Sequence, residues 1–239
     1  MSRPNSHTPI PLHSDTAAVI VAGGQGVRFG GKVRKQYLLL AGRPILWWSL
    51  QAFEKSPSIG EIVLVVPAED TDSVQRRTRD WKFSKLLSIV AGGSTRADSV
   101  RHGLQIVPPH FGWVAVHDAV RPLVTVETIE KTVKEARRSK AAIAASRSRD
   151  TVKLSDGEDR IISTPARERV WLAQTPQVFE RGLLVSAHAK GTGIPVTDDA
   201  QLVERLGVKV KLVESPVENF KVTLPFDLQH AKNIMGKRS

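Results

Sequence analysis

Short apolar runs alternate with amphipathic segments along most of the chain. The runs lack the strict apolar–polar alternation of a half-exposed strand, a pattern typical of strands buried on both faces. Between them, apolar residues recur at helical spacing, as at Ala97, Val100, Leu104 and Val107. This predicts an α/β fold with a mainly parallel sheet, helices on both faces and a ligand site beyond the carboxyl ends of the strands. The expected strands are residues 17–22, 62–66, 87–91, 113–117, 141–145 and 208–213.

Two helical segments begin with recognisable start signals. Pro44 opens segment 44–54, and proline is favoured in the first turn of a helix. Thr125 opens segment 125–136, where its hydroxyl can serve as an N-cap.

The segment 150–163 breaks the alternation of strand and helix. Two short runs flank Asp156-Gly157, a dipeptide typical of β-hairpin turns. A hairpin this small and polar is not stable alone. We therefore expect it to lie against its own domain or against a second subunit.

The composition narrows the class of protein. A chain of 239 residues can bury a full core, and we expect residues 16–239 to form one domain, because no repeat or linker divides them. Residues 1–15 are polar and lack the apolar segment of a secretory signal, so we expect a disordered leader. The absence of cysteine favours the reducing cytoplasm, and no apolar run is long enough to cross a membrane.

The formal net charge of +11 predicts a polyanionic partner, either nucleic acid or a phosphorylated small molecule. Basic clusters such as Arg76, Arg77 and Arg79 lie in polar helical segments without the aromatic residues of an RNA-binding sheet, so we expect no nucleic acid. Other basic residues lie beside Gly, Pro, Thr or Asp at apparent strand ends or in loops, where function is more common. They are Arg28, Lys35, Arg96, Arg121, Arg167 and Lys221.

The first expected strand leads into a glycine-rich, basic loop, AAVIVAGGQGVRFGGKVRKQY (17–37). It is not a dinucleotide fingerprint, because Phe29 stands where the third glycine belongs. It is not a P-loop, because Val33 replaces the hydroxyl residue that holds Mg²⁺. A glycine turn can still bring backbone N–H groups close to phosphate, with Arg28 and Lys35 as nearby cations. The loop suits a nucleoside triphosphate, although a purely structural glycine turn fits the same pattern.

Two further strand ends carry polar groups. AGGSTRADSV (91–100) has paired glycines, then hydroxyl and basic residues, then a helix. VHDAVRP (116–122) ends an apolar strand in His117-Asp118, with Arg121 just beyond. We expect His117 to be a packed strand-end residue. Arg121 alone could hold a buried Asp118. The alternative is that Asp118 binds Mg²⁺ arriving with a triphosphate, because Mg²⁺ prefers carboxylate oxygen and the chain has no cysteine or histidine cluster for zinc.

These ordered motifs resemble the 2-C-methyl-D-erythritol 4-phosphate cytidylyltransferase family. The resemblance covers about residues 17–231 and implies a three-layer αβα Rossmann-like nucleotidyltransferase domain. It implies transfer of CMP from CTP to 2-C-methyl-D-erythritol 4-phosphate, with release of pyrophosphate. It also implies a homodimer in which an extended β-hairpin arm, at about 148–168, crosses to the neighbouring subunit. Further matching stretches are RDTVK (149–153), PARERVWLAQTPQVF (165–179), PVTDDAQLVERLG (195–207) and ENFKVTLPFDL (218–228).

The resemblance implies roles for individual residues on the CTP side of the site. Two cations, Arg28 and Lys35, would neutralise the triphosphate as charge develops at the α-phosphorus. Residues of the glycine turns would contact the rest of the nucleotide. The cradle would consist of Ala22, Gly23, Gly24 and Gly26, and the contacts to cytosine or ribose would come from Gly93, Ser94 and Ser99. Members of the family often carry Asp or Glu where Ser94 stands.

On the acceptor side, the resemblance implies that Asp118 and Arg121 hold the methylerythritol end. Four residues would grip the substrate, Lys221 at its phosphate; they are Thr151, Arg167, Thr175 and Lys221. Thr151 and Arg167 lie in the arm and would serve the partner's active site. Thr197 would line the pocket, although Thr197-Asp198 could equally cap the helix that follows.

Two other functions fit parts of the same pattern. A ribitol 5-phosphate cytidylyltransferase would share the fold and the glycine loop and change the acceptor. A non-catalytic nucleotide- or RNA-binding protein would use the positive charge alone.

Overall fold

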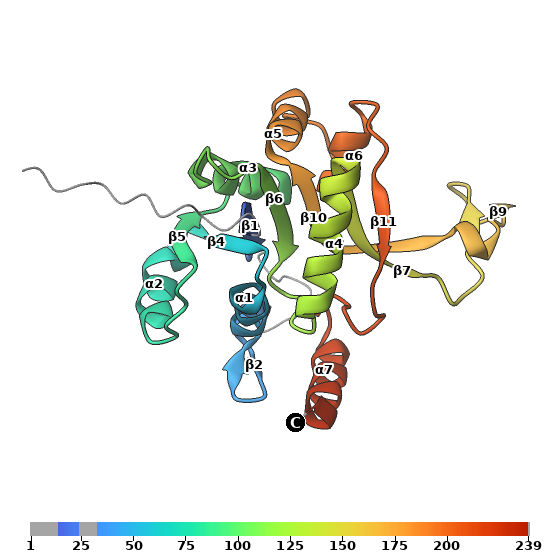
Figure 1. Cartoon of the computed structure of the whole chain (residues 1–239). Helices are drawn as coiled ribbons and strands as arrows, with labels where there is room; N and C mark the ends of the chain where they lie inside the picture. The colour runs from blue at the N-terminus through green and yellow to red at the C-terminus, as the bar shows by residue number, and fades with distance from the viewer. Residues whose placement is uncertain (1–13, 24–32, 239) are drawn as a thin grey trace, which may run out of the picture.

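The computed structural model describes residues 14–23 and 33–238, and a seven-stranded sheet forms its centre (Figure 1). The strand order is β11-β7-β10-β6-β1-β4-β5. Neighbouring strands are parallel except β10, which is antiparallel to both β6 and β7. The mainly parallel sheet predicted from the sequence is confirmed. Its strands are β1 (Thr16–Val21), β4 (Ile59–Val66), β5 (Leu86–Ala91), β6 (Trp113–Asp118), β7 (Ala141–Arg147), β10 (Trp171–Glu180) and β11 (Lys211–Glu214).

All six expected strands are present, with small differences at their ends, but β10 was not predicted. Its sequence, WLAQTPQVFE, places Pro176 and polar residues in the middle of the strand. Proline cannot donate to a sheet ladder and normally argues against a central strand. The structure accommodates it by shifting the register of β10 against β7 between Ala173 and Gln177.

Helices cover both faces of the sheet and give the predicted three layers. Alternate residues of β1 enter two different cores. Val19 packs with residues of α3, α5 and α6, whereas Ile20 packs with residues of α1, α2 and α4. Burial on both faces explains why the strand sequences show no apolar–polar alternation. The helices are α1 (Ile45–Lys55), α2 (Thr71–Arg79), α3 (Arg96–Ile106), α4 (Val126–Ser139), α5 (Arg181–Lys190), α6 (Asp199–Glu204) and α7 (Pro225–Arg238).

The two predicted helix starts are close to those observed. Thr125 caps α4, because its hydroxyl accepts a hydrogen bond of 3.1 Å from the N–H of Thr128. Pro44 is the residue immediately before α1 and does not lie inside it. The remaining short elements are β2 (Leu39–Leu40), β3 (Arg43–Pro44), η2 (Lys35–Tyr37), η3 (Ala68–Asp70) and η4 (Arg167–Arg169).

The predicted hairpin is confirmed as the antiparallel pair β8 (Leu154–Ser155) and β9 (Ile161–Ser163). It lies at the end of an arm formed by the extensions of β7 and β10, to the side of the sheet (Figure 1). Leu154, Ile161 and Ile162 are 48%, 63% and 65% exposed. The hairpin therefore leaves apolar side chains uncovered within one subunit.

Residues 1–13 of the expected leader lie outside the described residues. Asp15, which was expected in that leader, is fixed to the body of the protein by an ion pair with Arg137. Within the described ranges, no helix combines the length and the apolar character needed to cross a bilayer.

Candidate active site

The carboxyl ends of three parallel strands bring the sequence-predicted groups to one edge of the sheet. Val21, at the end of β1, is the register partner of Asp118, at the end of β6. The N–H groups of Ala22 and Gly92 bond to the carbonyls of Val65 and Val66 at the end of β4. The turns after β1 and β5 therefore lie at the same edge as Asp118, as open α/β sheets place their ligand sites.

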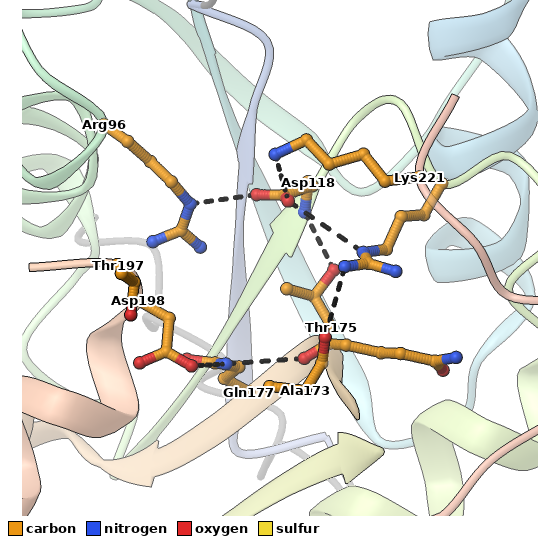
Figure 2. Close-up of a pocket in the computed structure, with 10 residues that line it drawn as sticks. Arg96, Asp118, Ala173, Thr175, Gln177, Thr197, Asp198 and Lys221 are labelled. Carbon is orange, nitrogen blue, oxygen red and sulfur yellow. Dashed lines mark hydrogen bonds and ion pairs between the residues drawn. The ribbon is translucent and has the colours of Figure 1, made fainter. Parts of the chain in front are cut away.

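A pocket of about 210 Å³ opens at this edge (Figure 2). Five of its lining residues were predicted for the acceptor substrate, and the structure brings them together; they are Asp118, Arg121, Thr175, Thr197 and Lys221. Five more had no predicted role toward a substrate; they are Arg96, Ala173, Gln174, Gln177 and Asp198. Several of these come from the middle of β10, where the register shift occurs. The predicted cap at Thr197-Asp198 is confirmed at Asp198, whose Oδ1 accepts a hydrogen bond of 3.0 Å from the N–H of Gln201 at the start of α6.

Asp118 is the centre of charge in this pocket. Its Oδ1 lies 2.9 Å from Nε of Arg96, and its Oδ2 lies 2.9 Å from Nζ of Lys221. Nε of Arg121 is more distant, at 3.9 Å from Oδ2. The interpretation that Arg121 alone holds Asp118 is therefore wrong. Burial would raise the pKa of Asp118, but the charges of Arg96, Lys221 and Arg121 lower it well below its usual range.

Asn219, from the ENFKV segment, explains how Lys221 reaches this carboxylate. The Asn219 side chain is buried and donates to the carbonyl of Thr175, at 2.9 Å, and to Oε1 of Gln174, at 3.0 Å. The carbonyl of Asn219 accepts from Nη1 of Arg121 at 2.8 Å. The segment is thus tied to β10 and to the loop after β6, and Lys221 follows two residues later.

Thr175 is buried, and its hydroxyl already has two partners. The oxygen accepts a hydrogen bond of 3.0 Å from the N–H of Asp118 and lies 2.9 Å from Nδ1 of His117. Burial lowers the pKa of His117 to about 3, so the ring is neutral, and it packs 4.8 Å from the ring of Phe53. His117 is therefore a packed strand-end residue, as expected.

On the predicted nucleotide side, the two glycine turns meet at Ser99. A Cβ added at Gly23 would lie 3.1 Å from Oγ of Ser99, and one at Gly92 would lie 2.8 Å from it. Only glycine permits this approach at Gly92 without a shift. The Ser99 hydroxyl accepts from the N–H of Gly93 at 3.1 Å and donates to the carbonyl of Thr95 at 3.0 Å. Ser99 therefore joins the turns after β1 and β5.

Ser94 contributes to the start of α3. Its hydroxyl donates to Oδ2 of Asp98 at 2.7 Å, and Thr95 and Asp98 form a capping box. The hydrogen bonds from Ser94 and Thr95 lower the pKa of Asp98 to about 2. The roles of Ser94, Gly93 and Ser99 toward cytosine or ribose stay predictions.

Three predicted CTP-binding residues, Gly24, Gly26 and Arg28, lie outside the described residues. Lys35 opens η2 beyond that gap, and both of its neighbours are anchored. Arg34 forms ion pairs with Glu69 and with Asp70, the latter at 2.6 Å. The buried Gln36 donates to the carbonyl of Ala22 at 2.8 Å. This bond holds the segment of Lys35 against the turn that follows β1.

Thr151 and Arg167 do not line the pocket of their own chain. Both are exposed and belong to the arm, where Nη1 of Arg167 lies 3.4 Å from the carbonyl of Arg149. Their predicted role in a partner's site stays a prediction.

The described residues contain no group of three or more His, Asp or Glu side chains that could hold a metal ion. Both oxygens of Asp118 already contact cationic side chains. A Mg²⁺ ion at this carboxylate would lie beside the charges of Arg96, Lys221 and Arg121, so this surrounding does not fit Asp118 as a direct metal ligand.

Sequence reasoning assigned no role to Arg96 or Gln177. The available signal for Arg96 was its position, because it follows the glycine turn after β5 and is one of the basic residues noted at strand ends or in loops. Gln177 fixes the start of α6: its Oε1 accepts from the N–H of Asp199, at 3.2 Å, and from that of Ala200, at 3.1 Å. Nothing in the sequence pattern indicates this contact.

The three-layer fold, the joined glycine turns and the cationic pocket define an α/β enzyme that binds phosphorylated ligands at the carboxyl edge of its sheet. The family model for 2-C-methyl-D-erythritol 4-phosphate cytidylyltransferase matches residues 16–237. The chain belongs to this family of nucleotidyltransferases, as the sequence motifs predicted.

Named relatives and solved structures agree with this assignment. Enzymes named 2-C-methyl-D-erythritol 4-phosphate cytidylyltransferase from Desulforamulus reducens and Geobacter metallireducens are 44% and 43% identical, over 93% and 92% of this chain and 96% and 97% of theirs. The crystal structure of 4-diphosphocytidyl-2C-methyl-D-erythritol synthase from Anaerococcus prevotii has a TM-score of 0.83 at 32% identity, covering 94% of this chain and 99% of that one. These names do not favour the ribitol 5-phosphate alternative.

Proposed function

We propose that this chain transfers CMP from CTP to 2-C-methyl-D-erythritol 4-phosphate, and that the pocket around Asp118 is the acceptor side of its active site. One observation carries the proposal. Within the described residues, Arg96, Arg121 and Lys221 surround one buried carboxylate at the sheet edge where the glycine turns meet. This arrangement offers fixed positive charge to a phosphorylated acceptor, beside a turn suited to a triphosphate.

In the proposed reaction, an oxygen of the acceptor's phosphate attacks the α-phosphorus of CTP. The new P–O bond forms as the bond to the bridging oxygen of the β-phosphate breaks, and pyrophosphate leaves. The phosphate is already ionised near neutral pH, so no enzyme nucleophile or general base is needed. The protein contributes by positioning the two substrates and by stabilising the developing charge.

The proposed roles divide the site into two parts. Lys221 binds the phosphate of the acceptor, and Asp118, Arg121, Thr175 and Thr197 shape the surrounding pocket. On the other side, the turns at Ala22, Gly23 and Gly93 bind CTP, and Arg28 and Lys35 neutralise its triphosphate. The bond between Gln36 and Ala22 supports this division, because it places Lys35 near the first turn.

We also propose that Mg²⁺ enters with CTP, bound by the phosphates of the nucleotide. Asp118 is better suited to orienting Arg96 and Lys221, which already occupy its two oxygens. The absence of cysteine fits the reducing cytoplasm that we propose as the location of the enzyme.

The arm supports a homodimer. Its exposed Leu154, Ile161 and Ile162 would be covered by a second subunit. In that dimer, Thr151 and Arg167 would reach the acceptor pocket of the partner, since they do not line their own.

The test is a pyrophosphate-release assay with CTP and each acceptor offered separately. We expect turnover with 2-C-methyl-D-erythritol 4-phosphate and poor use of UTP or ATP as donors. A higher kcat/KM with ribitol 5-phosphate would assign the protein to the alternative function. No pyrophosphate release with either acceptor would favour a binding protein.

A further inference from the structure

Arg96 connects two acidic side chains that are far apart in the sequence. Its Nε lies 2.9 Å from Oδ1 of Asp118, and its Nη1 lies 2.7 Å from Oδ2 of Asp199. Its remaining nitrogen, Nη2, is buried and has no hydrogen-bond partner in the described part of the chain. Buried donors are nearly always paired, so an unused buried donor on a side chain that lines a pocket indicates a partner from outside the chain, such as a molecule bound deep in that pocket.

The position of this donor indicates which group it would bind. Arg96 and Lys221 both line the pocket, and the two oxygens of Asp118 hold one cation each. Figure 2 shows the Arg96 guanidinium between Asp118 and the turn at Thr197 and Asp198. A phosphate group bound beside Asp118 would therefore meet both cations and could accept a charge-assisted hydrogen bond from each through a different oxygen.

Asp199 orients the guanidinium of Arg96 and lies outside the lining of the pocket. It is 1% exposed. Its Oδ1 lies 2.9 Å from Nε2 of His188, and its N–H donates to Oε1 of Gln177. Burial would raise the pKa of Asp199, but the charge of Arg96 and the contact with His188 lower it. The ionised carboxylate is thus fixed on several sides.

We propose that Arg96 is a second cation for the phosphate of the acceptor substrate, beside Lys221, and that Asp199 is a positioning residue that orients it. With Nε and Nη1 held by Asp118 and Asp199, Nη2 is left to donate to a phosphate oxygen. The inference rests on the proposed role of this pocket as the acceptor side of the site.

The experiment measures KM for each substrate separately in full-length Arg96→Lys and Asp199→Asn, by pyrophosphate release. Lysine keeps the charge but cannot hold two carboxylates and also donate to a ligand in one plane. We expect Arg96→Lys to raise KM for 2-C-methyl-D-erythritol 4-phosphate about tenfold, with KM for CTP within about twofold. Asp199→Asn keeps the shape and one acceptor but loses the charge. It should raise the acceptor KM by roughly three- to tenfold, again with little effect on CTP.

Arg101→Lys is the matched control, because it makes the same change on the same helix. Arg101 pairs with Asp98 at 2.9 Å and does not line the pocket, so both KM values should stay unchanged. Thermal unfolding of each variant checks that it is folded, and Asp199→Asn carries the test where Arg96→Lys is unstable.

The inference is overturned if both variants lower only kcat, or if they raise the two KM values equally. Either result would make Arg96 a structural counter-charge for Asp118 and Asp199. A wild-type protein without activity on CTP and methylerythritol phosphate would instead refute the proposed function.

Discussion

Replacing Asp118 with asparagine would test how much the charge of this carboxylate contributes to the stability of the folded protein. Asparagine keeps the shape and removes the charge that faces Arg96, Lys221 and Arg121. Removing one partner of a buried ion pair costs about 3–5 kcal/mol. We expect about 3 kcal/mol, near the lower limit, because Arg96 keeps Asp199 and the Lys221 side chain, which is 40% exposed, can be solvated. For a chain of this length, that loss lowers Tm by about 6–12 °C.

The pH dependence separates the charge of Asp118 from its shape. Its pKa in the folded protein lies below the usual range, so its contribution to stability is complete well above the unfolded pKa of about 3.9. That contribution is lost as the pH falls through the unfolded pKa toward the folded one. At pH 3 the Asp118 carboxyl is mostly protonated in the unfolded chain but is still ionised in the folded protein. This lowers the free energy of unfolding of the wild type, relative to that of Asp118→Asn, by about 1.3 kcal/mol.

Guanidinium unfolding, followed by tryptophan fluorescence, would measure the difference in unfolding free energy between the two proteins. It should be constant from about pH 6 to 8 and should shrink by about 1.3 kcal/mol at pH 3. Glu127→Gln is the control, because its ion pair with Lys131 is exposed and should contribute nothing measurable at either pH. A difference between wild type and Asp118→Asn that stays the same at pH 3 would refute the reasoning, as would an equally stable variant at pH 7.

Four further predictions concern the proposed function. Lys35→Ala should lower kcat by about 10²–10³, the effect of removing one donor to charge that develops in the transition state; a change in KM alone would contradict this. Lys221→Ala should raise KM for the acceptor and leave KM for CTP nearly unchanged. A larger rise in KM for CTP than in KM for the acceptor would refute the assignment. Excess EDTA should abolish pyrophosphate release, whereas full activity would exclude Mg²⁺. Deleting residues 152–162 should give a poorly active monomer in sedimentation experiments; an intact protein that is monomeric and active at micromolar concentration would exclude the arm-exchanged dimer.

The sequence predicts the sheet well because its central strands are buried on both faces. In β1, β4 and β6 this burial selects continuous apolar runs, which are easy to recognise. β10 was not predicted, because a polar, proline-containing stretch interrupts its apolar residues where the strand forms the pocket wall. The same polar stretch contains Thr175 and Gln177, which line the pocket.

The site was predicted as separate motifs, and its internal connections were not. The turn after β5 and the TDDAQ segment were both noted, but the ion pair between Arg96 and Asp199 joins residues 103 positions apart. Spacing along the chain carries no information about such a contact, because the fold decides which segments meet. The same holds for Asn219, which links the ENFKV segment to β10 through Gln174 and Thr175.

The carboxylate of Asp118 offsets part of the repulsion between the cations that the proposed function requires. A phosphate pocket needs several cations close together, but Arg96, Arg121 and Lys221 repel one another at a partly buried edge where water screens poorly. The carboxylate of Asp118 among them offsets part of that repulsion, and Asp199 offsets more at Arg96. Three cations against two carboxylates still leave the group with a net charge of +1. Asp118 also fixes the directions of Arg96 and Lys221 before a substrate arrives, so little reorganisation is needed when a phosphate binds. Asp118 is therefore more useful to this pocket as the anchor of its cations than as a metal ligand.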